Sequence, residues 1–400
     1  MTEAPRNPYR PGVGLRPTFL AGRQPDIDGF IKTLASSPEI PGNCRITGLR
    51  GVGKTVLLQR FQEEAEAGGW ATINVELEPR HCSDDNFRQL LEGKAAALEQ
   101  DLSVAGRVRN AAGAIAGVAR RAATVEYEGF KWSLAGDLDS TTKSIATILL
   151  EAATNATKQD RLGLVVLFDE AQVLVDDRSP AGDHPLSSLI ASVSTLQKQG
   201  VPLNLVLCGL PTLAVNLLSA RTYTERMFRG FKISSLKTED AKAAFLQPLE
   251  NTSVSATPDV TNQVVFDVDG YPYFIQLWGA ELWDATVAAG VSVISLETLR
   301  LIEDRITQRL DLDFYEPRIE SLTPAEQDLL MDSAKCTYPP LVVKELNKES
   351  KKSNENINVL LGRLVKSNIL YRPRKGEYRY TAPKFRDFLL RRFEAVDEDY

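Results

Sequence analysis

Histidine and cysteine are scarce in this chain of 400 residues. The sequence has two histidines and four cysteines, and the cysteines, at positions 44, 82, 208 and 336, show no Cys-x-x-Cys spacing. Neither a zinc site nor a disulfide framework is therefore expected. The adjacent His81 and Cys82 are interpreted as an incidental pair.

A long apolar run is also missing. The longest one, residues 162–168, is far shorter than the roughly 20 residues that a membrane-spanning helix needs. The start, residues 1–5, lacks the basic-then-apolar order of a signal peptide. Hydrophobic residues make up 43% of the chain and charged residues 25%, as in an ordinary globular protein. We therefore expect a cytoplasmic protein without a membrane partner.

The net charge of −6 argues against a protein coated with nucleic acid. The charge is unevenly distributed, however. Residues 318–394 contain 16 Lys and Arg and 10 Asp and Glu, a net charge of +6, which leaves −12 for the rest of the chain. A basic end on an acidic body indicates a specialised contact surface.

Residues 48–55 fit the pattern G-x-x-x-x-G-K-[ST] without a mismatch and lie between a predicted strand and a predicted helix. Glycines at these spacings let backbone N–H groups turn inward onto phosphates, while Lys54 adds a mobile charge and Thr55 a hydroxyl for Mg²⁺. The dipole of the following helix also favours an anion. The alternative is a glycine loop with only a structural role. The residues expected to bind the nucleotide are Gly48, Arg50, Gly51, Val52, Gly53, Lys54, Thr55 and Val56.

The apolar run at 162–168 is followed directly by Asp169 and Glu170. This pattern is typical of a buried parallel strand that ends at an active site. Asp169 is expected to hold Mg²⁺ through water, and Glu170 to polarise the attacking water. Two solvated acids at a strand end are the alternative. Together with the phosphate loop, the pair predicts a P-loop nucleotide hydrolase with Lys54 and Glu170 as catalytic residues.

Three domains are predicted from the changing pattern of elements. Residues 1–235 alternate strands and helices as an α/β core does, residues 236–315 contain helices only, and residues 316–400 form a separate unit. In the core, a helix at about 85–100 leads into an insertion at about 102–136 that is rich in alanine and arginine. The insertion either projects toward a partner, a lipid surface or nucleic acid, or forms a packed helix whose arginines face water. The small alanines favour the second interpretation.

The last unit has the element order of a winged helix-turn-helix. The predicted elements are a helix after a capping signal at 323–326, helices at 342–349 and 354–367, and two strands at 369–372 and 377–381. Residues 340–392 are the expected contact surface, and ten basic residues lie in it between 344 and 379: Lys344, Lys348, Lys351, Lys352, Arg363, Lys366, Arg372, Arg374, Lys375 and Arg379. Such a surface suits double-stranded DNA, with asparagines at 354, 356 and 358 able to read base edges. Contact with the chain's own nucleotide domain or with another protein is the alternative.

With these motifs in place, the chain resembles the AAA+ ATPases. Within them it is similar to the predicted bacterial and archaeal ATPases related to origin-recognition proteins and to the STAND signalling NTPases. The resemblance spans nearly the whole chain. Its segments are 19–23 with the Gly22-Arg23 box, 168–172 as Walker B, 208–213 after the fourth core strand, and 270–274 with the lid motif around Pro272.

This resemblance implies a three-layer core with a parallel sheet, an all-α lid and a C-terminal winged helix, with ATP and Mg²⁺ as cofactors. Gly22 and Arg23 would then lie near the adenine, and Pro272 would pack on the base. Two positions depart from the family. Cys208 and Gly209 stand where a polar sensor residue is usual, and Gln276 and Trp278 follow the lid motif without a sensor arginine. Slow hydrolysis is therefore expected.

Arg226 is the candidate arginine finger. It lies in the segment 220–229, at the distance after the sensor region where AAA+ proteins present an arginine to a neighbour's γ-phosphate. The alternative is a surface arginine paired with Glu225 or Asp240.

The function expected is an ATP-binding and ATP-hydrolysing switch whose nucleotide state controls homo-oligomer formation and DNA engagement. The alternative is a STAND-like signalling or defence scaffold whose winged helix contacts protein. Nucleotide binding without hydrolysis is a third possibility.

Overall fold

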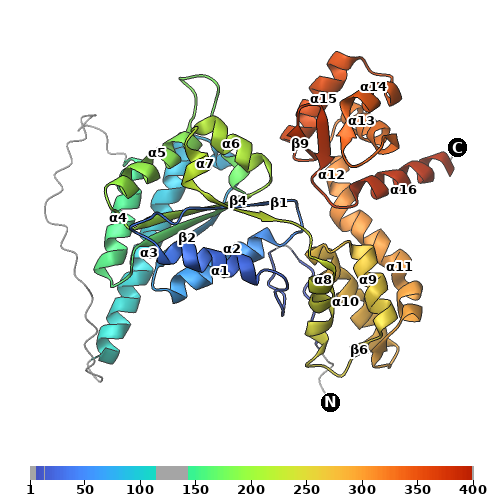
Figure 1. The fold of residues 1–400 in the computed structure, drawn as a ribbon, viewed down its shortest axis with the longest axis horizontal. Helices are drawn as coiled ribbons and strands as arrows, with labels where there is room; N and C mark the ends of the chain where they lie inside the picture. The colour runs from blue at the N-terminus through green and yellow to red at the C-terminus, as the bar shows by residue number, and fades with distance from the viewer. Residues whose placement is uncertain (1–5, 13, 114–142, 399–400) are drawn as a thin grey trace.

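The structure is a computed structural model that describes residues 6–12, 14–113 and 143–398 (Figure 1). Most of the insertion expected at about 102–136 lies outside the described residues. The helix expected at about 85–100 is longer than predicted, because α3 spans Asp84–Gly113. Alanines beyond residue 100 favour its continuation. In the described part of the chain, no helix is long and apolar enough to cross a membrane.

Five parallel strands form the central sheet in the order β2-β3-β4-β1-β5. Their bounds are β1 Cys44–Gly48, β2 Ala71–Glu76, β3 Leu164–Asp169, β4 Leu203–Gly209 and β5 Arg229–Ile233. In the register, Ile46 of β1 lies opposite both Cys208 and Phe231. Because the strands are parallel, the segments that follow β1, β3 and β4 all leave at the same edge. The predicted three-layer α/β core is confirmed.

Helices cover both faces of the sheet (Figure 1). One face packs on α1 Gln24–Ala35 and α2 Lys54–Ala67, and the other on α3, α4 Ile145–Lys158, α5 Pro185–Lys198 and α6 Thr212–Ala220. Along β3, Val165 and Leu167 pack on the side of α1 and α2, whereas Leu164, Val166 and Phe168 pack on the side of α3 to α6. The strand is apolar throughout because both of its faces are buried.

A helical region follows the core, and Figure 1 shows it beside the sheet. Its helices are α8 Thr238–Leu246, α9 Pro258–Val268, α10 Pro272–Ala288, α11 Leu296–Leu310, the π-helical turn η4 Asp311–Tyr315 and α12 Glu316–Glu320. The expectation of helices alone missed one small element, the parallel pair β6 Ser255–Ala256 and β7 Val293–Ile294. Strands of two residues are too short to leave a periodic signal in a sequence.

The C-terminal part contains four helices and a small sheet. The helices are α13 Pro324–Lys335, α14 Val343–Glu349, α15 Asn354–Lys366 and α16 Phe385–Glu398, and the strands are β8 Leu341–Val342, β9 Leu370–Arg374 and β10 Glu377–Tyr380. The expected capping box between Thr323 and Glu326 is present. Two strands were expected, but the sheet has three in the order β8-β10-β9 because β8 pairs with the free edge of β10.

One hydrophobic cluster runs from the helical region into the C-terminal part. Tyr315 lies at its centre, stacked on Phe388 with ring centroids 4.9 Å apart, and its hydroxyl donates to the carbonyl of Pro383 at 2.6 Å. The domain boundary predicted near residue 315 stays a prediction, and this cluster crosses it. Continuous packing means that the helical region and the C-terminal part resist moving independently.

The N-terminal segment joins the helical region to the core. Tyr9 is buried, and its hydroxyl donates to the carbonyl of Phe245 at 2.5 Å. Asn7 donates to the carbonyl of Ala280 at 3.1 Å. A side chain at Gly279 would place its Cβ 2.3 Å from the Tyr9 ring, so only glycine leaves room there. From this anchor the chain continues to α1 on the sheet.

Candidate functional site

The loop between β1 and α2 leaves the first turn of α2 open to an anion. Gly51 and Gly53 have φ angles of +78° and +87°, in the left-handed region that glycine adopts at least cost. A Cβ at Gly53 would meet no atom within 4 Å. The helix begins without a side-chain cap and without an acid in its first turn. Its first N–H groups therefore remain available for a ligand.

Lys54 lies across this loop. Its side chain is buried, and Nζ donates to the carbonyl of Leu49 at 3.0 Å. The ammonium group is thus held at the turn where the motif places a phosphate. Gly48 has another role, since a Cβ there would lie 2.4 Å from the carbonyl of Ile233. It lets β1 and β5 approach closely where they leave the sheet.

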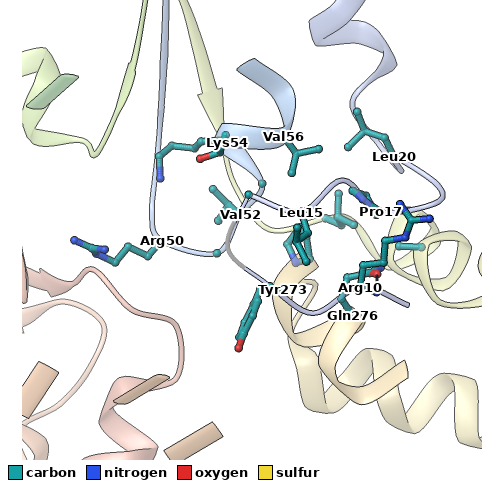
Figure 2. Close-up of a pocket in the computed structure, with 18 of the residues that line it drawn as sticks. Arg10, Leu15, Pro17, Leu20, Arg50, Val52, Lys54, Val56, Tyr273 and Gln276 are labelled. Atoms are coloured by element: carbon teal, nitrogen blue, oxygen red, sulfur yellow. Dashed lines mark hydrogen bonds between the residues drawn. The ribbon is translucent and has the colours of Figure 1, made fainter. Parts of the chain in front are cut away.

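A cavity of about 330 Å³ opens beside the loop. Figure 2 shows Lys54 and Arg50 on one side of it, and the apolar Leu15, Pro17 and Leu20 of the N-terminal segment, with Arg10 beside Pro17, on the other. The predicted site residues that line it are Arg23, Arg50, Gly51, Val52, Gly53, Lys54, Thr55, Val56, Glu170 and Pro272. Four others lie outside the lining: Gly22, Gly48, Asp169 and Arg226.

Arg23 braces the loop from the start of α1. Its Nη2 donates to the carbonyls of Val52 at 3.0 Å and Ser234 at 2.7 Å. Burial lowers the pKa of Arg23, while nearby Asp26 and Asp240 raise it. Gly22 has a φ of +65°, and a Cβ there would lie 2.8 Å from the Asp240 carboxyl group. Arg23 therefore links the loop to Ser234, the residue that directly follows β5.

The two carboxylates lie at the carboxyl end of β3. Asp169 is buried, and its Oδ1 accepts from the backbone N–H of Glu170 at 2.8 Å. Glu170 has a φ of +51° and lines the cavity. Burial, with Asp169 next to it, raises the pKa of the Cys208 thiol at the end of β4 well above its usual range. The thiol is therefore neutral at physiological pH.

Two lining residues were missed by sequence reasoning: Tyr273 lies in the lid-motif segment 270–274 but was given no role, and Arg318 belongs to no motif. Tyr273 of α10 donates its backbone N–H to the carbonyl of Gly51 at 3.3 Å. Arg318 of α12 lies over the Phe314 ring, 4.1 Å from its centroid. Burial, together with the neighbouring Arg50, lowers the pKa of Arg318 to about 10. The positive charges of Arg50 and Arg318 repel each other, so an anion bound between them would be favoured at this end of the cavity.

The C-terminal part also reaches the phosphate loop. The backbone N–H of Arg50 donates to the carbonyl of Thr381 at 3.2 Å. A second cavity, of about 1010 Å³, lies between the core and this part. Its basic lining comprises Lys232 of β5, Arg372, Arg374 and Arg379.

Arg226 lies on α7, Thr224–Met227, and is exposed to solvent. Among the described residues it forms no ion pair, so the alternative pairing with Glu225 or Asp240 does not occur. An exposed, unpaired guanidinium group on the core surface can meet a second molecule.

The residues fit a magnesium nucleotide. Thr55 supplies a hydroxyl at the start of α2 and Asp169 a carboxylate at the end of β3. The described residues contain no cluster of three His, Cys, Asp or Glu that could hold a metal by itself. Mg²⁺ commonly takes one or two protein oxygens and completes its shell with phosphate oxygens and water. Thr55 and Asp169 would supply these protein oxygens.

Comparisons with known proteins place this geometry in context. Residues 312–389 match a family described as a domain of unknown function, DUF8462. No curated protein matches the sequence. The structure is similar to that of the ORC2 protein of Aeropyrum pernix, with a TM-score of 0.56 and 14% identity over 97% of this chain and 98% of that one. It is also similar to a Walker-type ATPase of Pyrococcus abyssi, with a TM-score of 0.51 and 18% identity over 95% and 98% of the two chains.

The chain is similar in fold to these two proteins over nearly the whole length of each. At such identities the likeness concerns the fold. The roles of individual residues therefore rest on the geometry of the cavity.

Replacing Gly48 with alanine tests the close approach of β1 and β5. The new Cβ meets the carbonyl of Ile233, so we expect the free energy of unfolding to fall by about 1–3 kcal/mol. Gly93→Ala on α3 is the matched control, since a Cβ there meets nothing within 4 Å and alanine favours a helix. Denaturant unfolding measures both. Equal stability of Gly48→Ala and the parent protein would contradict the close approach.

Proposed function

We propose that this protein is an ATP-binding and ATP-hydrolysing AAA+ switch whose nucleotide state controls oligomer formation and DNA engagement. One observation carries the proposal. Residues at the open first turn of α2, including Lys54, line one cavity together with Glu170 and residues of the helical region. A phosphate chain bound there would touch both parts of the molecule.

The chain's own residues have distinct tasks in this proposal. Lys54 and the backbone N–H groups of residues 51–55 bind the phosphates, and Thr55 and Asp169 hold the metal. Glu170 accepts a hydrogen bond from the attacking water and orients it. Mg²⁺, when bound, neutralises charge that develops on the phosphoryl oxygens. The apolar end of the cavity, with Leu15, Pro17 and Leu20, suits a purine ring.

The part of the helical region up to residue 315, residues 236–315, is proposed as the lid, and residues 316–400, which begin with α12, as a winged-helix domain. The order of helices and strands in the C-terminal part supports the second assignment. Tyr273 and Arg318 would report the phosphates to this half of the chain, because both line the cavity. The ORC2 protein of Aeropyrum pernix was solved as ADPNP and ADP complexes, which supports ATP as the ligand.

DNA is the proposed partner of residues 340–392. The wing strands carry exposed Arg372, Arg374 and Arg379, and Lys375 lies in the turn between them. Side chains of this kind bind phosphates and position a protein on a duplex. A homo-oligomer is the second proposed partnership, with Arg226 presented to the nucleotide of a neighbour.

One observation favours a second candidate, a STAND-like signalling scaffold. The carbonyl of Thr381 already accepts a hydrogen bond from the phosphate loop at Arg50. In that case the C-terminal part binds its own nucleotide domain, and its basic surface serves a protein contact.

Two substitutions separate binding from hydrolysis. Lys54→Ala removes a charge-assisted bond to phosphate, and we expect about 10- to 100-fold weaker ATP affinity. Glu170→Gln keeps the affinity but slows hydrolysis by about 10²- to 10⁴-fold, because the amide cannot act as a base. Calorimetry and phosphate release measure the two effects, with the exposed Lys32→Ala of α1 as control. Undiminished affinity in Lys54→Ala would remove the proposed site.

Arg226→Ala tests the trans arginine. We expect unchanged ATP affinity and loss of the rise in turnover with protein concentration, on the order of 10³-fold at saturation. Arg221→Ala, a neighbouring exposed arginine, is the control. Equal turnover of Arg226→Ala and the parent protein at high concentration would refute the assignment.

Salt dependence distinguishes DNA from protein as the partner of the basic end. The full-length protein should lose duplex affinity steeply between low and moderate salt, at roughly one counterion per neutralised phosphate. The double variant Arg374→Ala/Lys375→Ala should weaken duplex binding and reduce the slope of log affinity against log salt concentration by about 2. The double variant Lys32→Ala/Lys94→Ala on the core should change neither. Absence of duplex binding at low salt would favour the signalling scaffold.

A further inference from the structure

Gln172 links the cavity carboxylate to the end of β4. It lies in the 3₁₀ turn η2, Ala171–Val173, that follows β3, and only 7% of it is exposed. Its Nε2 donates to Oε2 of Glu170, and its Oε1 accepts from the backbone N–H of Leu210 at 2.9 Å. A single side chain therefore connects the segments that leave two adjacent strands of the sheet.

The orientation of this amide is determined by its partners. A backbone N–H can only donate, so the carbonyl oxygen of Gln172 must face Leu210. The NH₂ group then faces Glu170, where it can donate to a carboxylate. Rotating the amide by 180° would oppose donor to donor at Leu210 and acceptor to acceptor at Glu170. The two contacts thus hold Gln172 in one state.

Two further features hold the glutamine in place. Asn216 of α6 donates its Nδ2 to the main-chain carbonyl of Gln172 at 3.0 Å. A Cβ at Gly209 would lie 2.3 Å from Oε1 of Gln172, so glycine at the end of β4 leaves the space that the amide occupies. Cys208 and Gly209 leave this strand end without a hydroxyl or amide side chain. The buried amide of Gln172 supplies the polar group there.

We propose that Gln172 is a positioning residue that fixes the Glu170 carboxylate for its contact with the attacking water. This inference rests on the proposed ATP hydrolysis. One oxygen of Glu170 is bonded to Gln172, and in the part of the chain that the structure describes the other, Oε1, has no hydrogen-bond partner. Because Glu170 lines the cavity, that free oxygen is the one available to water.

Removing the amide should lower turnover without weakening binding. In Gln172→Leu the carboxylate can leave its position, and a displacement of about 1 Å costs up to about 100-fold in rate. We expect kcat to fall by about 10- to 100-fold, with the KM for ATP and the ADP affinity unchanged within about twofold. A second readout needs no turnover, since amide hydrogen exchange at Leu210 should become faster once its acceptor is gone.

The matched control is Gln263→Leu on α9. Gln263 is exposed and donates to Oδ1 of Asp267 at 2.9 Å, so it also forms an amide–carboxylate bond, but outside the cavity lining. Its substitution should leave kcat and exchange at Leu210 unchanged. Equal thermal unfolding midpoints of the two variants and the parent would show that lost turnover in Gln172→Leu is not lost folding.

Gly209→Ala provides an independent approach to the same contact. Its Cβ displaces the Gln172 amide, so turnover should fall to a similar degree as in Gln172→Leu. In a Gln172→Ala background the Oε1 atom that obstructs the new Cβ is gone. Adding Gly209→Ala there should lower turnover by less than about a further twofold, since the effects of coupled positions are not additive. Additive losses would overturn the inference.

The possible failures are distinguishable. Absence of ATP turnover in the unsubstituted protein overturns the proposed hydrolysis and the role of Gln172 with it. Turnover in the parent that Gln172→Leu retains in full overturns the positioning role alone. Parallel loss of ATP and ADP affinity in Gln172→Leu would identify a general structural role and also overturn the inference.

Discussion

The first N–H groups of α2 are the constraint on which the rest of the site depends. A helix start without a side-chain cap leaves donors that need an acceptor, and here Gly53 opens the approach to them. Arg23 holds the preceding loop through the carbonyl of Val52, and Lys54 lies across it. The loop is thus rigid in shape but unsatisfied in charge, which is the condition for binding an anion strongly.

Three distant parts of the chain contact this short loop through its backbone. Tyr273 of the helical region bonds to Gly51, the C-terminal Thr381 bonds to Arg50, and Arg23 bonds to Val52. The helical region and the C-terminal part share one hydrophobic cluster around Tyr315. A change of charge in the cavity therefore acts on two parts of the chain that are packed together, the helical region and the C-terminal part. Close packing favours a shift between discrete arrangements over gradual bending.

Most of the core could be predicted because its signals are local. Lys54 and Thr55 occupy one loop of known spacing, and Asp169 and Glu170 directly follow a strand that is apolar on both faces. Parallel strands then bring these ends together without further information. The third strand of the small C-terminal sheet, β8, and the short pair β6 and β7 could not be predicted, because strands of two residues carry no periodicity.

The sequence alone determined the phosphate loop, the acidic strand end and the α/β core, since each depends on residues adjacent in the chain. Tertiary structure decided the remainder. Arg318 and Tyr273 line the cavity, and Arg23 donates to the carbonyl of Val52 in the loop. The side chain of Gln172, which follows β3, accepts from the backbone of Leu210, which follows β4. The hydrogen bonds made by Arg23, Gln172 and Tyr273 join residues 29, 38 and 222 positions apart (273 − 51 = 222 for Tyr273 and Gly51). Such bonds follow from the packing of the sheet and helices, which no local pattern records.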